Sequence, residues 1–321
     1  MSVLRSAFAT LVLGAAVGAN AQGYPTRSIQ VVSPVQAGSA GDTSLRILTS
    51  RLSENIGQQL VVENIAGAAG MIGMDRLIRA TPDGYTIGGV SDSTLTYVPI
   101  LQKRANFDAL AVLEPISIVA LSTWVLIVHP SLPVHSTREL IALAKKNPGG
   151  IDYASAGNGG SHNLVMEMFK AEARVSLTHI PYKGATQAAL DVQGGRVPVM
   201  FSALAPVLPA VQSGRVKALG VATEARSNLL PNVPTISESA LPGFTFSTWT
   251  GLFAPKGTPK NVLGRLSMEV EKALKEPAIR ERYASVGATA HPSSPAQLED
   301  LLRKTREKMA KVIKQAGITS E

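Results

Sequence analysis

Short runs of apolar and β-branched residues alternate along this chain with longer segments in which apolar residues recur every three or four positions. The short runs predict strands at 29–32, 60–63, 86–90, 115–120, 124–128, 151–154, 177–180, 197–201 and 216–221. The longer segments predict helices at 43–56, 72–80, 137–146, 161–173, 184–193, 259–275 and 295–316. Strands that alternate with helices in this way indicate an α/β fold, with a parallel sheet covered by helices on both faces.

The length of the chain favours two lobes, because about 300 residues exceed the usual size of a single core. We expect the chain to cross between the lobes first near 120–123. We expect it to return near 245–250, after the proline-containing segment 226–243, which has only weak periodicity. The predicted lobes are 22–121 plus 249–321, and 122–248.

The N-terminal residues have the pattern of a secretory signal peptide. Arg5 precedes the apolar run 7–17, and Ala19 and Ala21 supply small residues at the −3 and −1 positions of a cleavage site. A membrane anchor is the alternative, but the run is shorter than the ~20 residues that span a bilayer, and no cysteine follows it to carry a lipid. We expect residues 1–21 to be removed and the mature protein, without membrane spans, to reside in the periplasm.

The composition excludes several kinds of site. Without cysteine, the chain has no disulfide, no thiol nucleophile and no thiolate metal site. Its 31 Lys and Arg against 23 Asp and Glu give a formal charge of +8, or +7 once Arg5 leaves with the signal peptide. The cations are scattered and aromatic residues make up only 5%, so nucleic acid is not expected as a partner. A small anionic ligand suits this charge better.

Three loops rich in Gly, Ala and Ser stand where a predicted strand passes into a predicted helix, at 36–42, 66–70 and 155–162. Small residues let the backbone approach a ligand closely, and the free N–H groups at the start of each helix favour an anion. The alternative is that the small residues only form tight turns. The ligand-binding residues predicted from these loops are Gly38, Ser39, Asp42, Gly67, Ala68, Ala69, Gly70, Ser155, Gly157, Asn158, Gly159, Ser161 and His162.

Catalytic and metal sites have little support in the sequence. The five histidines lack the i, i+4 spacing of metal ligands, and no nucleophile-elbow or nucleotide-binding motif occurs, so we expect no cofactor and no metal. Ser161 and His162 leave open a secreted α/β enzyme, although sequence neighbours on a helix do not face each other. Asp42 either favours the dipole of the first helix or orients the ligand. Trp249 is either a buried hinge residue or an aromatic wall over the ligand.

An ordered set of motifs runs through the whole mature chain. It comprises Tyr24-Pro25, the glycine loop ending in Asp42, Val61-Val62-Glu63-Asn64, Ala66–Gly70, Pro82–Thr86, Ala156–Gly159, Pro181–Gly184, Pro231–Thr235 and Ala254–Pro259. In this order the motifs resemble those of the Bug family, the solute-binding components of tripartite tricarboxylate transporters.

The resemblance implies a periplasmic binding protein of type II, with two α/β lobes and a ligand cleft between them. It implies a small carboxylate as ligand, such as a di- or tricarboxylic, amino or aromatic acid, and transient contact with integral membrane transporter subunits. We expect a monomer. A ligand-sensing subunit for a membrane receptor is an alternative use of the same pocket. The resemblance extends the predicted site to Ser91, Ser93, Thr94, Tyr182, Lys183, Gly184 and Ser202, and the return crossing adds Trp249.

Three departures from the family pattern fall at the expected edges of the pocket. Ser33-Pro34-Val35 stands where Pro-Phe-Pro is usual, Val98 replaces a frequent Asn, and Ser202 stands where Asp is common. An ammonium group would favour a carboxylate at the last of these positions. Ser202 therefore argues against an amino-acid ligand, unless Asp42 supplies the missing charge.

Overall fold

The computed structural model describes residues 23–102 and 107–316, and the predicted signal peptide, 1–21, lies outside them. The strands are β1 (Ile29–Ser33), β2 (Leu60–Asn64), β3 (Thr86–Ser91), β4 (Leu113–Val128), β5 (Asp152–Ser155), β6 (Thr178–Pro181), β7 (Val199–Ala203), β8 (Lys217–Val221), β9 (Ser247–Pro255) and β10 (Ala288–Ala290). The helices are α1 (Ala40–Ile56), η1 (Ala68–Gly70), α2 (Met71–Ile78), α3 (Asp92–Leu95), α4 (Tyr97–Leu101), α5 (Ala109–Val112), α6 (Thr137–Lys146), α7 (Ser161–Ala173), α8 (Ala185–Gln193), α9 (Leu204–Gln212), α10 (Ile236–Ser239), α11 (Lys260–Lys275), α12 (Pro277–Ser285) and α13 (Pro295–Ala316).

Within the described residues the strands form one ten-stranded sheet, in the order β2-β1-β3-β9-β4-β7-β5-β6, with β8 and β10 also paired to β4. At one end β1 is parallel to β2 and β3, and at the other end β5 is parallel to β6 and β7. In the middle β4 and β9 pair antiparallel. The predicted α/β class is confirmed, and the parallel pairing belongs to the two ends. We call these ends the β1 side (β1, β2, β3, β10) and the β5 side (β5, β6, β7, β8).

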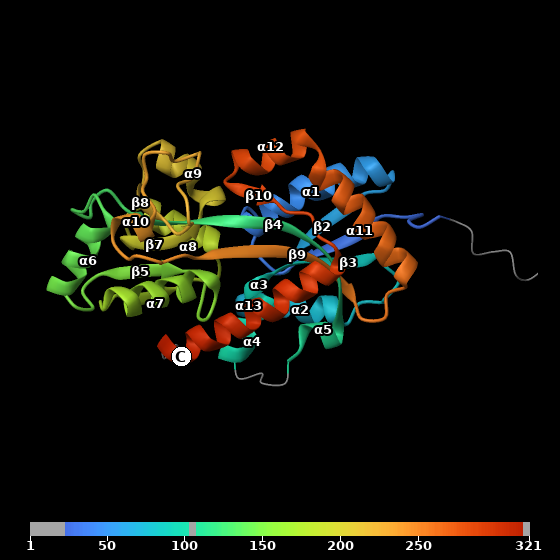
Figure 1. Ribbon diagram of the computed structural model, residues 1–321, viewed down its shortest axis with the longest axis horizontal. Helices are drawn as coiled ribbons and strands as arrows, with labels where there is room; N and C mark the ends of the chain where they lie inside the picture. Colours follow the sequence, from blue (N-terminus) through green and yellow to red (C-terminus); the bar gives the residue numbers. More distant parts are fainter. Residues whose placement is uncertain (1–22, 103–106, 317–321) are drawn as a thin grey trace, which may run out of the picture.

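Strand β4 joins the two sides. Up to Thr123 it pairs with β9, and from Trp124 onward it pairs with β7 and β8. The sequence predicted two separate strands in this region, but Ser122 and Thr123 stay paired to β9 and make β4 continuous. Figure 1 shows β4 and β9 running between the β1 side and the β5 side. Strand β4 thus changes its pairing partner next to residues 120–123, where the first crossing between lobes is expected.

Each side has its own layer of buried apolar side chains. On the β1 side, Ile29 and Leu48 pack with Leu266, which brings β1, α1 and α11 together. On the β5 side, Met200 packs with Val207, which joins β7 to α9. A fully buried side chain of this size contributes roughly 1.5–3 kcal/mol. The loops that leave these strands are therefore held on two rigid supports.

Some elements differ from those predicted. Helix α9 carries two prolines, and α12 and β10 are short, so none of the three was expected from periodicity. Helix α13 packs on β4 and also contacts α4 and α7, so it touches elements from both sides. None of the helices in the described ranges is both long enough and apolar enough to cross a membrane.

Candidate functional site

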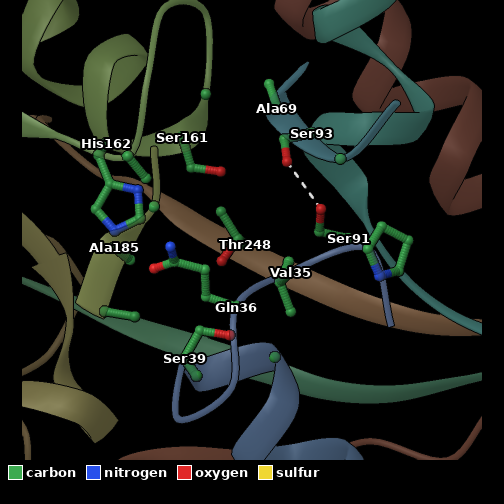
Figure 2. A pocket seen from close by; sticks show the side chains of 18 of the residues that line it. Val35, Gln36, Ser39, Ala69, Ser91, Ser93, Ser161, His162, Ala185 and Thr248 are labelled. Carbon is green, nitrogen blue, oxygen red and sulfur yellow. Dashed lines mark hydrogen bonds between the residues drawn. The ribbon is translucent and has the colours of Figure 1, made fainter. Parts of the chain in front are cut away.

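A cavity of about 140 Å³ lies where loops from both sides of the sheet meet (Figure 2). Of the residues predicted to bind ligand, the cavity wall includes Ser39, Gly67, Ala69, Gly70, Ser91, Ser93, Ser161, His162, Lys183, Gly184 and Trp249. The wall also includes residues that the predicted site omitted, namely Pro34, Val35, Gln36, Ala40, Gly41, Ala66, Trp124, Ala156, Gly160, Ala185, Ala203, Pro206, Thr248 and Thr250. Residues from all three small-residue loops therefore meet at one cavity, and their part in binding stays a prediction.

The other predicted residues lie off this wall. They are Gly38, Asp42, Ala68, Thr94, Ser155, Gly157, Asn158, Gly159, Tyr182 and Ser202. Several of them hold the lining loops in place. The hydroxyl of Ser202 donates to the carbonyl of Ala203 at 2.9 Å, and the hydroxyl of Tyr182 donates to Asp191 at 2.9 Å.

Asp42 holds the first small-residue loop, 36–42, in place through hydrogen bonds. Its buried carboxylate accepts hydrogen bonds from the Gly38 N–H at 2.9 Å, from Arg46 Nε at 3.0 Å and from Asn64 Nδ2 at 2.8 Å. Asn64 Nδ2 also donates to the Val35 carbonyl at 3.1 Å, so one network ties both ends of the loop to β2 and α1. Burial acts to raise the pKa of Asp42, but these hydrogen bonds outweigh it and hold the pKa below its ordinary value.

The second loop meets a cluster of hydroxyl groups at the end of β3. Ser91 Oγ lies 2.9 Å from Ser93 Oγ, and Thr94 Oγ1 donates to the Ala69 carbonyl at 3.2 Å. Gly70 has a φ of +93°, and a Cβ there would lie 2.5 Å from Thr94 Oγ1. Glycine is therefore required both for this backbone conformation and for the close approach of the loop to α3.

The third loop is tied down by its own polar side chains. The Ser155 hydroxyl accepts from the Gly157 N–H at 3.1 Å, and Asn163 Oδ1 accepts from the Gly159 N–H at 3.1 Å. These contacts turn the chain into α7, whose N-cap Gly160 offers no side-chain cap. The first N–H groups of α7 are therefore not capped by a side chain.

Ser161 and His162 do not form a catalytic pair. The Ser161 hydroxyl accepts from Tyr97 at 2.7 Å, and the His162 ring packs edge-on against Trp124 with centroids 4.8 Å apart. The two side chains point in different directions (Figure 2). Burial lowers the pKa of His162 to about 4, so the imidazole is neutral at physiological pH. Ser161 and His162 each line the cavity without contacting one another through their side chains in the described hydrogen bonds.

Trp249 is both buried and part of the cavity wall, so its position is compatible with either role that the sequence left open. The side chain is buried and its Nε1 donates to Thr305 Oγ1 on α13 at 3.1 Å. It also lines the cavity, as does Trp124, whose Nε1 donates to Thr248 Oγ1 at 2.9 Å. Both tryptophans of the chain thus form part of the wall.

The electrostatics of the wall favour an anion. Helices α1, α7 and α8 begin at the wall, through residues 39–41, 160–162 and 184–185, and the positive ends of their dipoles face the cavity. Among the described lining residues, Lys183 is the one with a formal charge at neutral pH. No group of three or more His, Cys, Asp or Glu side chains suited to a metal occurs in the described ranges.

Two contacts close the cavity across the sides. Thr186 Oγ1 on α8 donates to the Ala37 carbonyl at 3.2 Å, and the Tyr97 hydroxyl of α4 reaches Ser161 on α7. Each bond joins a loop or helix next to β1 or β3 with a helix next to β5 or β6. The structure therefore shows the two sides in contact around the cavity.

Comparison with known proteins relates this chain to a family of transporter receptors. The sequence model described as "Tripartite tricarboxylate transporter family receptor" matches residues 44–318. The chain is 33% identical to Protein BugT of Bordetella pertussis, over 95% of this chain and 94% of the relative. Three solved structures have a similar fold. Rpa4515 of R. palustris with adipate has a TM-score of 0.90 and 29% identity, covering 92% of this chain and 99% of that one.

MatC of Rhodopseudomonas palustris with bound malate has a TM-score of 0.84 and 27% identity, covering 90% of this chain and all of that one. The structure of periplasmic binding protein BugD has a TM-score of 0.87 and 33% identity, covering 93% of this chain and all of that one. The resemblance to the Bug family and the fold of a periplasmic binding protein are confirmed by these likenesses. The chain belongs to the tripartite tricarboxylate transporter receptor family and is a solute-binding protein of that family.

Proposed function

We propose that this protein binds a small carboxylate in the cavity and passes it to the membrane subunits of a transporter without chemical change. The lobes that enclose the ligand are 22–121 plus 249–321, and 122–248. The protein works as a monomer in the periplasm, after removal of residues 1–21.

One observation carries the proposal: three helices begin at the wall of a cavity whose one formal charge is a lysine. A carboxylate there would accept hydrogen bonds from backbone N–H groups and from hydroxyls such as Ser39 and Ser93. The helix dipoles and Lys183 would balance its charge. The adipate and malate held by two relatives support a carboxylate as the ligand class.

Thermal unfolding against a panel of carboxylates tests the ligand class. A ligand that binds only the native state stabilises it by about 2.7 kcal/mol at a hundred times its Kd, which raises the melting temperature by about 5 °C. The bound acid should be recovered unchanged. A panel that leaves the melting temperature unaltered contradicts carboxylate binding, and consumption of the acid would favour the enzyme alternative.

Lys183→Met sharpens this test. Removing the positive charge from the wall should weaken binding of the acid severalfold, since the residue is exposed and its charge is partly screened. Lys145→Met on the exposed face of α6 is the matched control and should leave affinity unchanged. Equal effects of both variants would show that only the net charge of the protein matters.

Uptake measurements separate transport from sensing. Deleting the gene should abolish uptake of the labelled acid by the cells, and a copy with an intact cavity should restore it. Normal uptake together with a lost transcriptional response to the acid would favour the sensing alternative. Light scattering of the purified protein checks the monomer.

A further inference from the structure

Gln36 places a carboxamide inside the cavity. It lies on the loop between β1 and α1, and its side chain is directed from the β1 side toward His162 and Ala185 (Figure 2). The side chain is half-buried. Among the described lining residues it is the one with an amide side chain, whereas the other polar side chains are hydroxyls, the two indoles, His162 and Lys183.

The amide oxygen of Gln36 is buried without a hydrogen-bond partner among the described residues. A buried acceptor left in this state costs free energy, so most such groups in native proteins are satisfied. A carboxamide carries a donor and an acceptor side by side, and a flip exchanges their places without removing either. In this conformation the oxygen lies against Gly184. Rotation of the amide group would bring it to the cavity face, where it would stand as an acceptor beside the N–H donors of the same group.

Gly184 on the opposite side makes room for this carboxamide. A Cβ at Gly184 would lie 2.0 Å from Gln36 Cδ and 2.1 Å from Oε1. The backbone of Gly184 is extended, with φ 178°, so any residue could adopt it and the glycine is needed only for space. The neighbouring bond from Thr186 to the Ala37 carbonyl holds the loop in register with α8. The position of the Gln36 carboxamide thus depends on its own loop, on the β1 side, and on residues 184 and 186, on the β5 side.

We propose that Gln36 selects acids that carry a hydroxyl group next to the carboxylate. The ligand hydroxyl would donate to the amide oxygen while the carboxylate accepts from the amide nitrogen, so both halves of the carboxamide are satisfied by adjacent groups of one ligand. An acid without the hydroxyl leaves the buried acceptor unsatisfied. An ammonium could donate as well, but the described lining residues include no carboxylate to balance it.

This inference rests on the proposed binding of carboxylates, and matched pairs of acids test the two separately. The pairs are lactate and propionate, malate and succinate, citrate and tricarballylate, and mandelate and phenylacetate, each differing by one hydroxyl. Calorimetry on the mature wild-type protein should show tighter binding of the hydroxylated member, by about tenfold, in every pair that binds. Aspartate should bind more weakly than malate.

Gln36→Met keeps the length of the side chain and removes both polar atoms. It should abolish the preference for the hydroxylated acid. It should also weaken binding of both members of each pair, because the ligand carboxylate loses the amide N–H donor in either case. Gly184→Ala should push the flexible carboxamide aside and lower the preference too. In the Gln36→Ala background the three atoms nearest to this alanine's Cβ are absent, so the same alanine should have little further effect.

The outcomes are distinct. If none of the eight acids binds, the proposed function fails and this inference fails with it. If acids bind without a hydroxyl preference, or if the preference survives Gln36→Met, the role of Gln36 is wrong and carboxylate binding stands. Circular dichroism and the melting temperature of each variant without ligand check that its fold is intact.

Discussion

Two buried aspartates stand at the beginnings of helices on the β1 side, and their chemistry differs. Asp42 lies in the first turn of α1, where Arg46, Asn64 and the Gly38 N–H hold its pKa below the ordinary value despite burial. Asp92 begins α3, where burial raises its pKa to about 7 against hydrogen bonds from the backbone of Ser93 and Trp249. Both side chains are nearly inaccessible to solvent, at 2% and 3% exposure, but Asp92 lies deeper and has no Arg or Asn partner like those of Asp42, so its desolvation prevails.

The opposite pKa shifts of Asp42 and Asp92 imply different roles for the two carboxyl groups. Asp42 stays ionised and fastens the first loop of the cavity with charge-assisted bonds. Asp92 lies between Ser91 and Ser93 on the wall and receives its hydrogen bonds from backbone N–H groups. Near neutral pH it is poised between charged and uncharged forms. The predictions below test whether the two carboxyl groups behave in these opposite ways.

Asp92→Asn should give the largest effect, a gain in stability at high pH. An Asp whose pKa is raised by folding binds more protons in the native state, so wild-type stability falls as pH rises from about 4 to about 7. The neutral amide avoids this loss. The variant should equal the wild type near pH 4 and exceed it by about 4 kcal/mol above pH 7, measured by urea unfolding.

Asp42→Asn is the comparison variant, because the pKa of Asp42 is held below its ordinary value, and it should show no gain in stability at high pH. A stability difference between Asp92→Asn and the wild type that is the same at pH 4 and pH 8 would mean that the carboxyl group of Asp92 is ionised throughout.

Asp42→Ala should act in the opposite direction and cost about 2 kcal/mol at pH 7, since three donors lose their acceptor. Asp42→Asn should cost less, because the amide oxygen still accepts. The pKa of Asp42 is lowered by folding, so its contribution is present above about pH 4 and is lost as pH falls below that. Urea unfolding at pH 7 and pH 3 checks this. A loss that persists undiminished at pH 3 would contradict the ionic role.

The contrast also marks what the sequence can and cannot predict. The β1–α1 loop, the small-residue loops and the first turn with Asp42 follow from local pattern, and the cavity forms where they were expected to meet. Asp42 lies off the cavity wall and is held there in part by Asn64, which is 22 residues along the chain on β2. Only strand pairing brings the two together, so local pattern could not choose between the two roles of Asp42.

Other features that the sequence did not predict also depend on the three-dimensional arrangement of the chain. Helix α9 was missed because Pro206 and Pro209 suggest a break, yet Pro206 lies in the first turn, where no intrahelical partner is needed for its nitrogen. Gln36 belongs to the first small-residue loop but was not among the predicted binding residues, since the position of its amide against Gly184 becomes apparent only in the folded chain. Thr248 and Thr250 flank Trp249 on β9 and line the cavity with it. Gln36, Thr248 and Thr250 line the cavity because of where the folded chain puts them, and their residue types alone do not indicate it.

A smaller effect is expected on ligand affinity. Ionisation of Asp92 puts a negative charge next to two wall serines, so affinity for an anionic acid should fall severalfold as pH rises from 6 to 8.5. Asp42 is ionised throughout this range and His162 is neutral, so neither adds to the change. Calorimetry with the acid that binds best should show this slope in the wild type and in Asp42→Asn, and a flat profile in Asp92→Asn. A slope retained in Asp92→Asn would assign it to another group.

The smallest effect is spectroscopic and follows Asp92 directly. Because the backbone of Trp249 hydrogen-bonds to this carboxyl, its ionisation changes the field at the indole, and the emission should shift slightly with a midpoint near pH 7. Trp124→Phe leaves Trp249 as the one tryptophan of the chain, so the signal can be assigned. In that background Asp92→Asn should remove the transition, whereas Asp42→Asn should leave its midpoint unchanged. A midpoint near pH 4 instead would place Asp92 in the same class as an ordinary solvated carboxyl, and the distinction between the two aspartates would reduce to their different hydrogen bonds.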